Sequence, residues 1–223
     1  MLYYLKNSIN IAEIGKEYPQ IQDFDLHDST PLDYTILDKE GLVPSNYCVK
    51  RLILHKNAKV TDFLSSSPMS DFLFFHNKVV KLLSSFHLAI YQVFDFTFIH
   101  RSQEYKSHEA MYFIKDQKYL RLIDWEKSRF YKTKDWHNTI LEEYKFSNWD
   151  EMRDFDRKHF WGNKEFGFLY KIKINYTHPF DLVNFRYFGL PPGYVCTQKV
   201  KSLIENEGFT GFRFEPVDSE YFV

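Results

Sequence analysis

Carboxylate and imidazole side chains gather near the N-terminus, at Asp23, Asp25, His27 and Asp28. Alternate positions of a loop can converge on one point, and oxygen and nitrogen ligands of this kind bind divalent metal ions. The calcium-loop pattern is incomplete, however, because no glycine turn follows and no glutamate stands at the twelfth loop position. We therefore interpret the run as a solvated acidic surface, open to contact with a partner, rather than as a metal site.

A second group, Asp154, Asp156 and His159, lies near the end of a predicted helix. Asp156 and His159 are three positions apart, so they would be neighbours on the helix surface. Paired carboxylates beside a histidine can carry out general acid–base catalysis when a cleft buries them. The adjacent Arg157 and Lys158 favour another interpretation, in which the group forms exposed ion pairs that contribute little to stability.

The other reactive side chains lack the partners that their chemistry needs. His108 begins the nearest approach to a zinc-binding helix, but Tyr112 occupies the place of the second imidazole. Ser128 has no adjacent histidine, and Cys48 and Cys196 show neither metal-ligand spacing nor a neighbouring base. Cys196 is either a reactive thiol at a helix N-terminus or, as we expect, a buried small residue. The sequence thus predicts no catalytic, cofactor-binding or metal-binding residues.

The composition limits the function classes further. Of 223 residues, 44% are hydrophobic and only 8 are glycine, which provides a sizeable core and leaves no glycine-rich phosphate loop. The 19% of aromatic residues are expected to fill that core. The 29 basic and 30 acidic residues nearly cancel, so no overall field attracts nucleic acid or an anionic membrane. With no signal peptide pattern at 1–6 and no apolar run of membrane-spanning length, we expect a cytoplasmic protein.

Hydrophobic periodicity indicates the elements that would position these residues. We predict an edge strand at 2–5, a loop over the acidic stretch 22–40, and short strands at 47–54 and 59–64. Helices are predicted from Ser70 to about Ser84 and from Asn148 to about Lys158, the second with Glu151 in a near capping box. Further strands are expected at 87–99, 110–115, 119–124, 129–132, 166–176 and 182–187, with a hairpin connection over 101–107. This mixture predicts an α+β fold, a mainly antiparallel sheet with a few helices packed on it, in a single domain over 1–223.

The segment from Thr197 to Pro216 is the most distinct local unit. Apolar residues recur at helical spacing up to Gly208, and glycine commonly ends a helix in the left-handed conformation. The Thr197 hydroxyl group is expected to cap this helix. After Gly208 the period changes to two, so Phe212 and Phe214 share one face of a strand, and we expect both to be buried.

This unit resembles the C-terminal signature of a family of bacterial immunity proteins. The resemblance rests on the polar start of the helix, on Gly208-Phe209-Thr210-Gly211-Phe212 and on Phe214-Glu215-Pro216-Val217. A looser likeness occurs at 68–71 and at Ile123-Asp124-Trp125-Glu126-Lys127-Ser128, so the similar region covers about 60–217 and leaves 1–58 outside it. Cys196 departs from the family pattern, which usually has serine at that position.

The resemblance implies a small cytoplasmic protein that binds and neutralises a cognate toxin and is not an enzyme. Six acidic residues against Lys39 alone give the stretch 22–40 a net charge of −5, and we expect part of it to face a basic toxin surface. The residues expected at this contact are Asp23, Asp25, Asp28 and Asp33. Two alternatives stay open, a small hydrolase-like enzyme that uses the Asp and His clusters and a protein-interaction module of a phage or regulatory system.

Overall fold

The structure, a computed structural model, describes residues 1–28, 42–44, 46–67, 69, 71–114, 117–134, 139–161, 163, 165–174, 180–185 and 193–217. It confirms the predicted α+β class with mainly antiparallel sheets. Contacts divide the chain into unit 1 (Met1–Asp116, Phe180–Asn184 and Tyr194–Pro216) and unit 2 (Gln117–Pro179, Phe185–Gly193 and Val217–Val223). A single domain over 1–223 stays a prediction. None of the helices in the described ranges combines the length and apolar character needed to cross a membrane.

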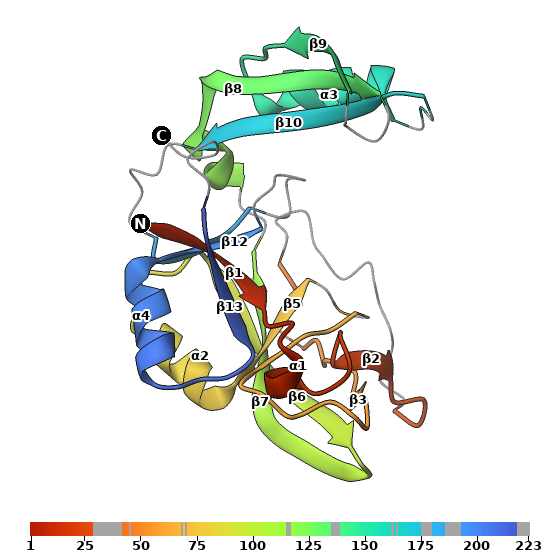
Figure 1. Cartoon of the computed structure of the whole chain (residues 1–223), viewed down its shortest axis with the longest axis vertical. Helices are drawn as coiled ribbons and strands as arrows, with labels where there is room; N and C mark the ends of the chain where they lie inside the picture. The colour runs from red at the N-terminus through yellow and green to blue at the C-terminus, as the bar shows by residue number, and fades with distance from the viewer. Residues whose placement is uncertain are drawn as a thin grey trace. The chain divides into compact units, whose positions relative to one another are not determined.

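Unit 1 contains a six-stranded sheet in the order β2-β3-β6-β7-β5-β4 (Figure 1). Its strands are β2 (Ile21–Phe24), β3 (Leu52–Leu54), β4 (Phe63–Leu64), β5 (Phe72–His76), β6 (Tyr91–His100) and β7 (Gln103–Phe113). β3 runs parallel to β6, and the other neighbouring pairs are antiparallel. Strands β3 and β4 are shorter than the predicted 47–54 and 59–64.

The six-stranded sheet curls until its two ends meet. Ile21 of β2 pairs with Leu54 on one side and with Ser66, just after β4, on the other. The Ile21 N–H donates to the Ser65 carbonyl at 2.9 Å, and the Ser67 N–H donates to the Ile21 carbonyl at 3.1 Å. Because these bonds satisfy backbone groups that a sheet edge would expose, the sheet forms a closed barrel.

Aromatic side chains fill the barrel, as the composition predicted. Phe74 and Phe98 are fully buried and Phe96 is 2% exposed. The Phe96 ring centre lies 4.5 Å from that of Phe74 and 5.7 Å from that of Phe98. Burial of large rings at such distances is a main source of stability in a core of this size.

The predicted helix from Ser70 to Ser84 is wrong in its first half. Residues Phe72–His76 form β5, which lies between β7 and β4, and helix α2 begins only at Asn77 and ends at Leu83. Phe72 through Phe75 are all buried, so this strand is apolar on both faces and lacks the alternation that identifies a half-exposed strand. The His76 ring accepts a hydrogen bond from the Lys78 N–H at 3.2 Å and caps α2.

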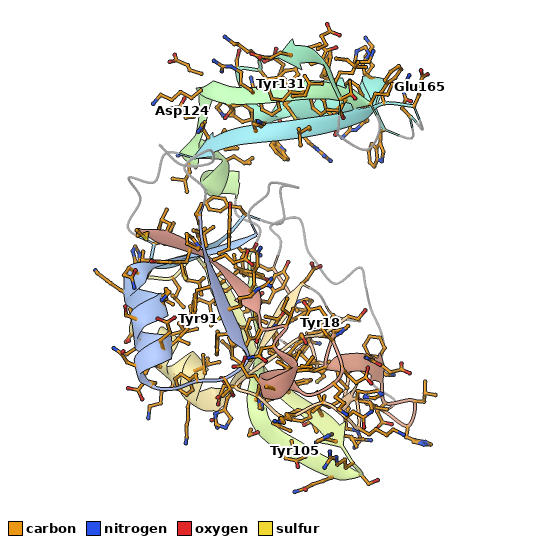
Figure 2. The ribbon with its side chains drawn as sticks, viewed as in Figure 1. Tyr18, Tyr91, Tyr105, Asp124, Tyr131 and Glu165 are labelled. Carbon is orange, nitrogen blue, oxygen red and sulfur yellow. The ribbon has the colours of Figure 1, made fainter. Side chains whose placement is uncertain are left out.

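Strands β6 and β7 form a long hairpin whose far end projects from unit 1, where Tyr105 lies (Figure 2). Its turn consists of Arg101 and Ser102 alone, with φ angles of 51° and 65°. The predicted connection over 101–107 is therefore wrong, because β7 already begins at Gln103. Residues in this part of the hairpin are mostly solvent-exposed, so a polar sequence is compatible with strand structure there.

A four-stranded antiparallel sheet in the order β11-β12-β1-β13 completes unit 1. Its strands are β1 (Leu2–Asn7), β11 (Leu182–Asn184), β12 (Tyr194–Thr197) and β13 (Phe212–Pro216), and helix α4 (Gln198–Asn206) contacts β1 and β12. β1 was predicted at an edge but lies between β12 and β13, a pairing that joins the two ends of unit 1. A short helix, α1 (Ile11–Ile14), follows β1.

The rings of Phe212 and Phe214 stack on one face of β13, as predicted, with centroids 6.2 Å apart. The prediction that both are buried is wrong, because both are only partly buried. Within the described residues β13 has a neighbouring strand on one side only, so solvent reaches its side chains. Phe212 nevertheless contacts the outer surface of the barrel, with ring centres 5.1 Å from Phe63 and 5.7 Å from Phe75.

Unit 2 consists of a three-stranded antiparallel sheet in the order β10-β8-β9, with one helix packed on it (Figure 1). Its elements are η1 (Gln117–Leu122), β8 (Ile123–Lys134), β9 (Thr139–Tyr144), α3 (Trp149–His159) and β10 (Gly167–Ile174). Phe155 of α3 contacts Tyr144, Phe146 and Phe168 on the sheet side. The predicted strand 119–124 is wrong, because η1 occupies most of it. The predicted strand 129–132 is part of the longer β8. Strand β9 was not predicted.

The helix predicted from Asn148 is confirmed as α3, including its N-terminal cap. The Asn148 side-chain oxygen accepts a hydrogen bond from the Glu151 N–H at 2.9 Å, and the Glu151 carboxylate accepts one from the Ser147 N–H at 2.8 Å. This reciprocal capping satisfies N–H groups that a helix end would otherwise leave without partners.

Candidate functional site

The acidic run at 23–28 is held by one arginine of unit 1. Asp25 is 3% exposed, and its Oδ2 atom lies 2.6 Å from Nε and 2.5 Å from Nη2 of Arg51. A hydrogen bond from the His27 N–H, followed by the contact with Arg51, holds the Asp25 pKa below its usual value. The Arg51 N–H also donates to the Asp28 carboxylate at 2.5 Å.

The four predicted contact residues therefore differ in their environments. Asp25 and Asp28 bind to Arg51 within the protein, whereas the Asp23 side chain is exposed and accepts a hydrogen bond from the Phe24 N–H at 2.8 Å. Asp33 lies outside the described residues. Nowhere in the described ranges do three His, Cys, Asp or Glu side chains come together in a way that could hold a metal ion.

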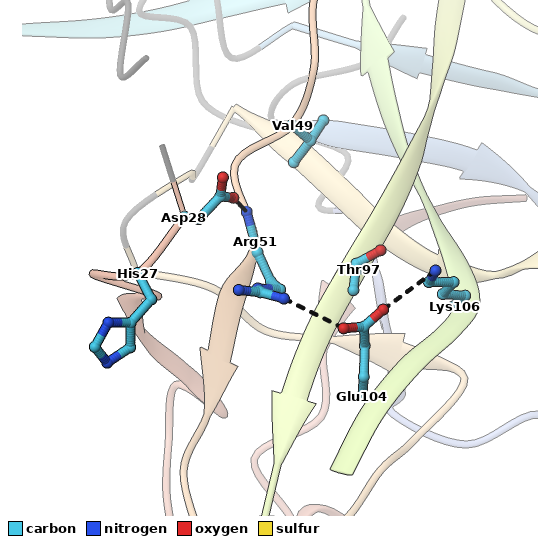
Figure 3. Close-up of a pocket in the computed structure, with 7 residues that line it drawn as sticks. All are labelled: His27, Asp28, Val49, Arg51, Thr97, Glu104 and Lys106. Carbon is cyan, nitrogen blue, oxygen red and sulfur yellow. Dashed lines mark hydrogen bonds and ion pairs between the residues drawn. The ribbon is translucent and has the colours of Figure 1, made fainter. Parts of the chain in front are cut away.

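The end of the acidic run lines a pocket of about 310 Å³ on unit 1 (Figure 3). Its lining residues are His27, Asp28, Val49, Arg51, Thr97, Glu104 and Lys106. Glu104 lies between two cations, with its carboxylate oxygens 3.2 Å from Arg51 Nη1 and 3.2 Å from Lys106 Nζ. The charges alternate in sign and neutralise one another, so the pocket is suited to contact with a polar surface more than to activation of a nucleophile.

The second predicted group, on α3, forms ion pairs with the flanking arginines, of which the Asp154 pair is exposed as expected and the Asp156 pair is partly buried. The Asp154 carboxylate lies 3.8 Å from Arg157 Nη1, and the Asp156 carboxylate lies 3.7 Å from Arg153 Nη1. The His159 ring packs against Phe155 with 4.5 Å between ring centres. This arrangement provides ion pairs along a helix surface rather than a buried acid and base.

The two cysteines and His108 are also explained by structure. Cys196 is fully buried in β12, and burial raises the pKa of its thiol to about 12, which confirms a buried small residue and argues against a reactive thiolate. Cys48 is exposed. His108 lies in strand β7, 2% exposed, with Nε2 2.8 Å from the Thr61 carbonyl oxygen. A strand cannot present residues 108 and 112 in the manner of a zinc-binding helix.

The segment that resembles the immunity-protein signature is a junction within unit 1. Thr210 donates hydrogen bonds to the Asp62 carboxylate from both its N–H and its hydroxyl group, each at 2.8 Å. The Phe63 N–H donates to the Thr210 carbonyl at 3.0 Å. The Gly211 N–H donates to the Glu13 carboxylate at 2.7 Å. These bonds attach the turn before β13 to the start of β4 and to α1; we call this set the closing junction.

Glycine is required at one position of the closing junction by space as well as by conformation. Gly211 has a φ of +88°, and a Cβ atom there would lie 2.2 Å from the Phe63 carbonyl oxygen. Gly208 has a φ of +70° after α4, as predicted, but open space around it. The Thr197 hydroxyl group, predicted to cap α4, does not do so and donates instead to the Asp181 carboxylate at 3.0 Å.

The looser likeness at 123–128 forms a bulge inside β8, where its pairing with β10 shifts register. The Asp124 carboxylate accepts a hydrogen bond from the Lys127 N–H at 3.0 Å. The Ser128 hydroxyl group donates to the Asp124 carbonyl at 2.7 Å and accepts from the Lys173 N–H at 2.9 Å. Ser128 thus serves a structural role that joins β8 to β10.

Comparison with known proteins gave no relative: no protein-family model and no curated protein matches the sequence. Sequence reasoning also missed one surface, the row of Trp and Arg residues at 149, 153 and 157 on α3 and at 161 in the turn after it. The regular spacing of four residues was the available signal.

Proposed function

We propose that this protein is a non-enzymatic immunity protein that binds a cognate toxin in the cytoplasm and blocks its action. The observation that carries the proposal is the closing junction, because the residues of the signature-like segment, Gly208 to Phe212, join β13 to the barrel. A sequence similarity that is confined to residues of this structural kind supports a shared fold. Within that fold, the function of a binding protein depends on the residues at its surface.

The charged groups support binding over the hydrolase alternative. Asp25, which is buried, forms a close ion pair with Arg51 within the protein. General acid–base catalysis needs a group whose proton can be exchanged with a substrate in a cleft, whereas this carboxylate is held by a permanent cation. A binding protein needs only complementary shape and charge.

The predicted acidic contact now depends on Asp23 among the described aspartates. Exposed charge of this kind mainly accelerates encounter with an oppositely charged partner. We expect Asp23→Asn to lower the association rate with a basic toxin at low salt and to leave it unchanged at high salt. Glu207→Gln, which removes another exposed carboxylate of unit 1 away from the acidic run, serves as the matched control. Equal association rates for the two variants at low salt would exclude the acidic surface as a contact.

The experiment that tests the function uses the product of the gene adjacent to the one that encodes this protein, which the proposal predicts to be a toxin. Co-expression should restore growth of cells that produce this toxin, and the purified proteins should form a stoichiometric complex in size-exclusion chromatography. The toxin should be inactivated by mutation for the binding measurement, so that binding and activity are separated. If the two proteins neither form a complex nor restore growth, the proposed function is wrong.

A further inference from the structure

α3 and the turn that follows it carry a row of two tryptophans and two arginines. Trp149, Arg153 and Arg157 follow one another on the helix at intervals of four residues, about one helical turn each, and Trp161 lies in the turn just after the helix end. The Arg153 guanidinium lies 5.5 Å from the centre of the Trp149 ring, and the Arg157 guanidinium lies 6.0 Å from that of Trp161. We call these four residues the Trp–Arg stripe.

The outer end of the stripe is strongly exposed to solvent. Trp161 is 73% exposed, more than any other Phe, Tyr or Trp side chain that the structure describes. The Arg157 side chain is 61% exposed. The inner side of the same helix is used for folding, since Met152 is fully buried and Phe155 contacts the sheet. Tryptophan and arginine are the residue types most enriched among those that dominate binding energy at protein interfaces.

The guanidinium groups of the stripe are held loosely by their own helix. Arg153 and Arg157 lie 3.7 Å and 3.8 Å from the carboxylates of Asp156 and Asp154, which is longer than a hydrogen bond. Each guanidinium therefore keeps donor positions available for a bidentate contact with an incoming carboxylate. The stacked contact with a tryptophan limits the freedom of each arginine, so less entropy is lost on binding.

The surrounding charges indicate the chemistry of the partner. α3 also carries four carboxylates, at Asp150, Glu151, Asp154 and Asp156, which interrupt the continuous positive surface that a nucleic-acid backbone requires. Two separate guanidiniums, one beside Trp149 and one beside Trp161, instead fit separate carboxylates beside apolar side chains. We propose that the Trp–Arg stripe is a docking surface for a partner protein whose contact surface carries Asp or Glu residues next to apolar groups. On the proposed function, on which this inference rests, that partner is the toxin.

The test compares adjacent residues of one helix. Binding of the inactivated toxin, identified as the product of the adjacent gene under the proposed function, is measured for the wild type, for Arg157→Glu and for Lys158→Glu, which makes the same charge change beside the stripe. Arg157→Glu should raise Kd about 30-fold or more, as expected for a central interface residue, and Lys158→Glu should change it less than about 3-fold. If Arg157→Glu lowers the melting temperature, binding is also measured for Arg157→Gln, which removes the charge and keeps a side chain of similar length.

The tryptophan at the end of the stripe gives a second, uncharged comparison. Trp161→Ala should weaken binding about 30-fold, whereas Ile140→Ala, at a 52% exposed apolar residue of β9, should leave it unchanged. If the wild type binds the toxin and every stripe variant binds equally well, the stripe inference is wrong and the immunity function stands. If the wild type does not bind the toxin, the proposed immunity function itself is wrong. A single-stranded thymidine oligonucleotide is tested as well. If the wild type binds it and Arg157→Glu abolishes that binding, the choice of a protein partner is wrong.

Discussion

Acidification should destabilise unit 1 through His108. This side chain lies inside the barrel, 2% exposed, with Nε2 2.8 Å from the Thr61 carbonyl oxygen and Nδ1 3.1 Å from the Ser107 hydroxyl group. A neutral ring satisfies both contacts, because Nε2–H donates to the carbonyl and Nδ1 accepts from the hydroxyl group. The His108 pKa is lowered to about 4. Burial is the largest cause and the neighbouring His76 adds to it, while the Thr61 carbonyl and Asp62 oppose the shift.

The size and sign of the effect follow from this pKa. In the unfolded chain His108 takes up a proton near pH 6.5, and in the folded protein near pH 4. Between these values the unfolded state binds more protons, so the free energy of unfolding falls as the pH is lowered. The stabilisation is complete above pH 6.5, decreases through this window and is lost below pH 4, a total of about 3 kcal/mol for this side chain.

The assay is denaturant unfolding at a series of pH values for the wild type and for His108→Gln. Glutamine can donate a hydrogen bond to the Thr61 carbonyl and does not titrate. The difference between the two proteins should therefore shrink or reverse by about 3 kcal/mol from pH 7 to pH 4. His100, whose pKa burial also lowers, titrates in both proteins and cancels. Parallel curves for the two proteins, or an NMR titration of the wild-type His108 ring near pH 6.5, would refute the reasoning.

Three further predictions concern structure that the site depends on. Gly211→Ala should prevent or severely weaken folding, because the new Cβ atom would lie 2.2 Å from a carbonyl oxygen. Gly208→Ala, where the space is open, should lower the free energy of unfolding in denaturant by only about 1 kcal/mol. Arg51→Met should lower the melting temperature more than the double variant that combines Asp25→Asn with Arg51→Met, because the single change leaves a buried carboxylate without its cation. A lower melting temperature for the double variant would contradict the role of this ion pair. Treatment with a strong chelator should leave the melting temperature and toxin binding unchanged, and a stoichiometric metal ion in the purified protein would contradict this expectation.

Features that depend on nearby residues could be predicted from the sequence, and those that depend on distant ones could not. The cap at Asn148 and the left-handed turn at Gly208 are set within a few residues, and both are present. β5 was mistaken for a helix because a strand buried on both faces has no alternating pattern. The barrel closure at Ile21 and Ser66 depends on residues far apart in the chain.

The same limit applies to the candidate site. The run Asp23 to Asp28 was found from residue types alone, but its partner Arg51 lies on a segment that folds back beside it. Without this pairing, Asp25 could not be distinguished from an exposed contact residue. The Trp–Arg stripe, by contrast, is local and has a spacing of four residues in the sequence, but it was not predicted, because only the structure shows which side of α3 faces solvent and which rings the arginines contact.

The position of β1 between β12 and β13 has a consequence for synthesis on the ribosome. β1 is made among the first residues of unit 1, but both strands that pair with it are made last. Its backbone N–H and C=O groups therefore have no strand partner until β12 has left the exit tunnel. Unit 2, whose sheet and helix lie between these segments in the sequence, can fold during this interval. A pause in translation before β12 would therefore prolong the lifetime of an exposed strand that is prone to aggregation.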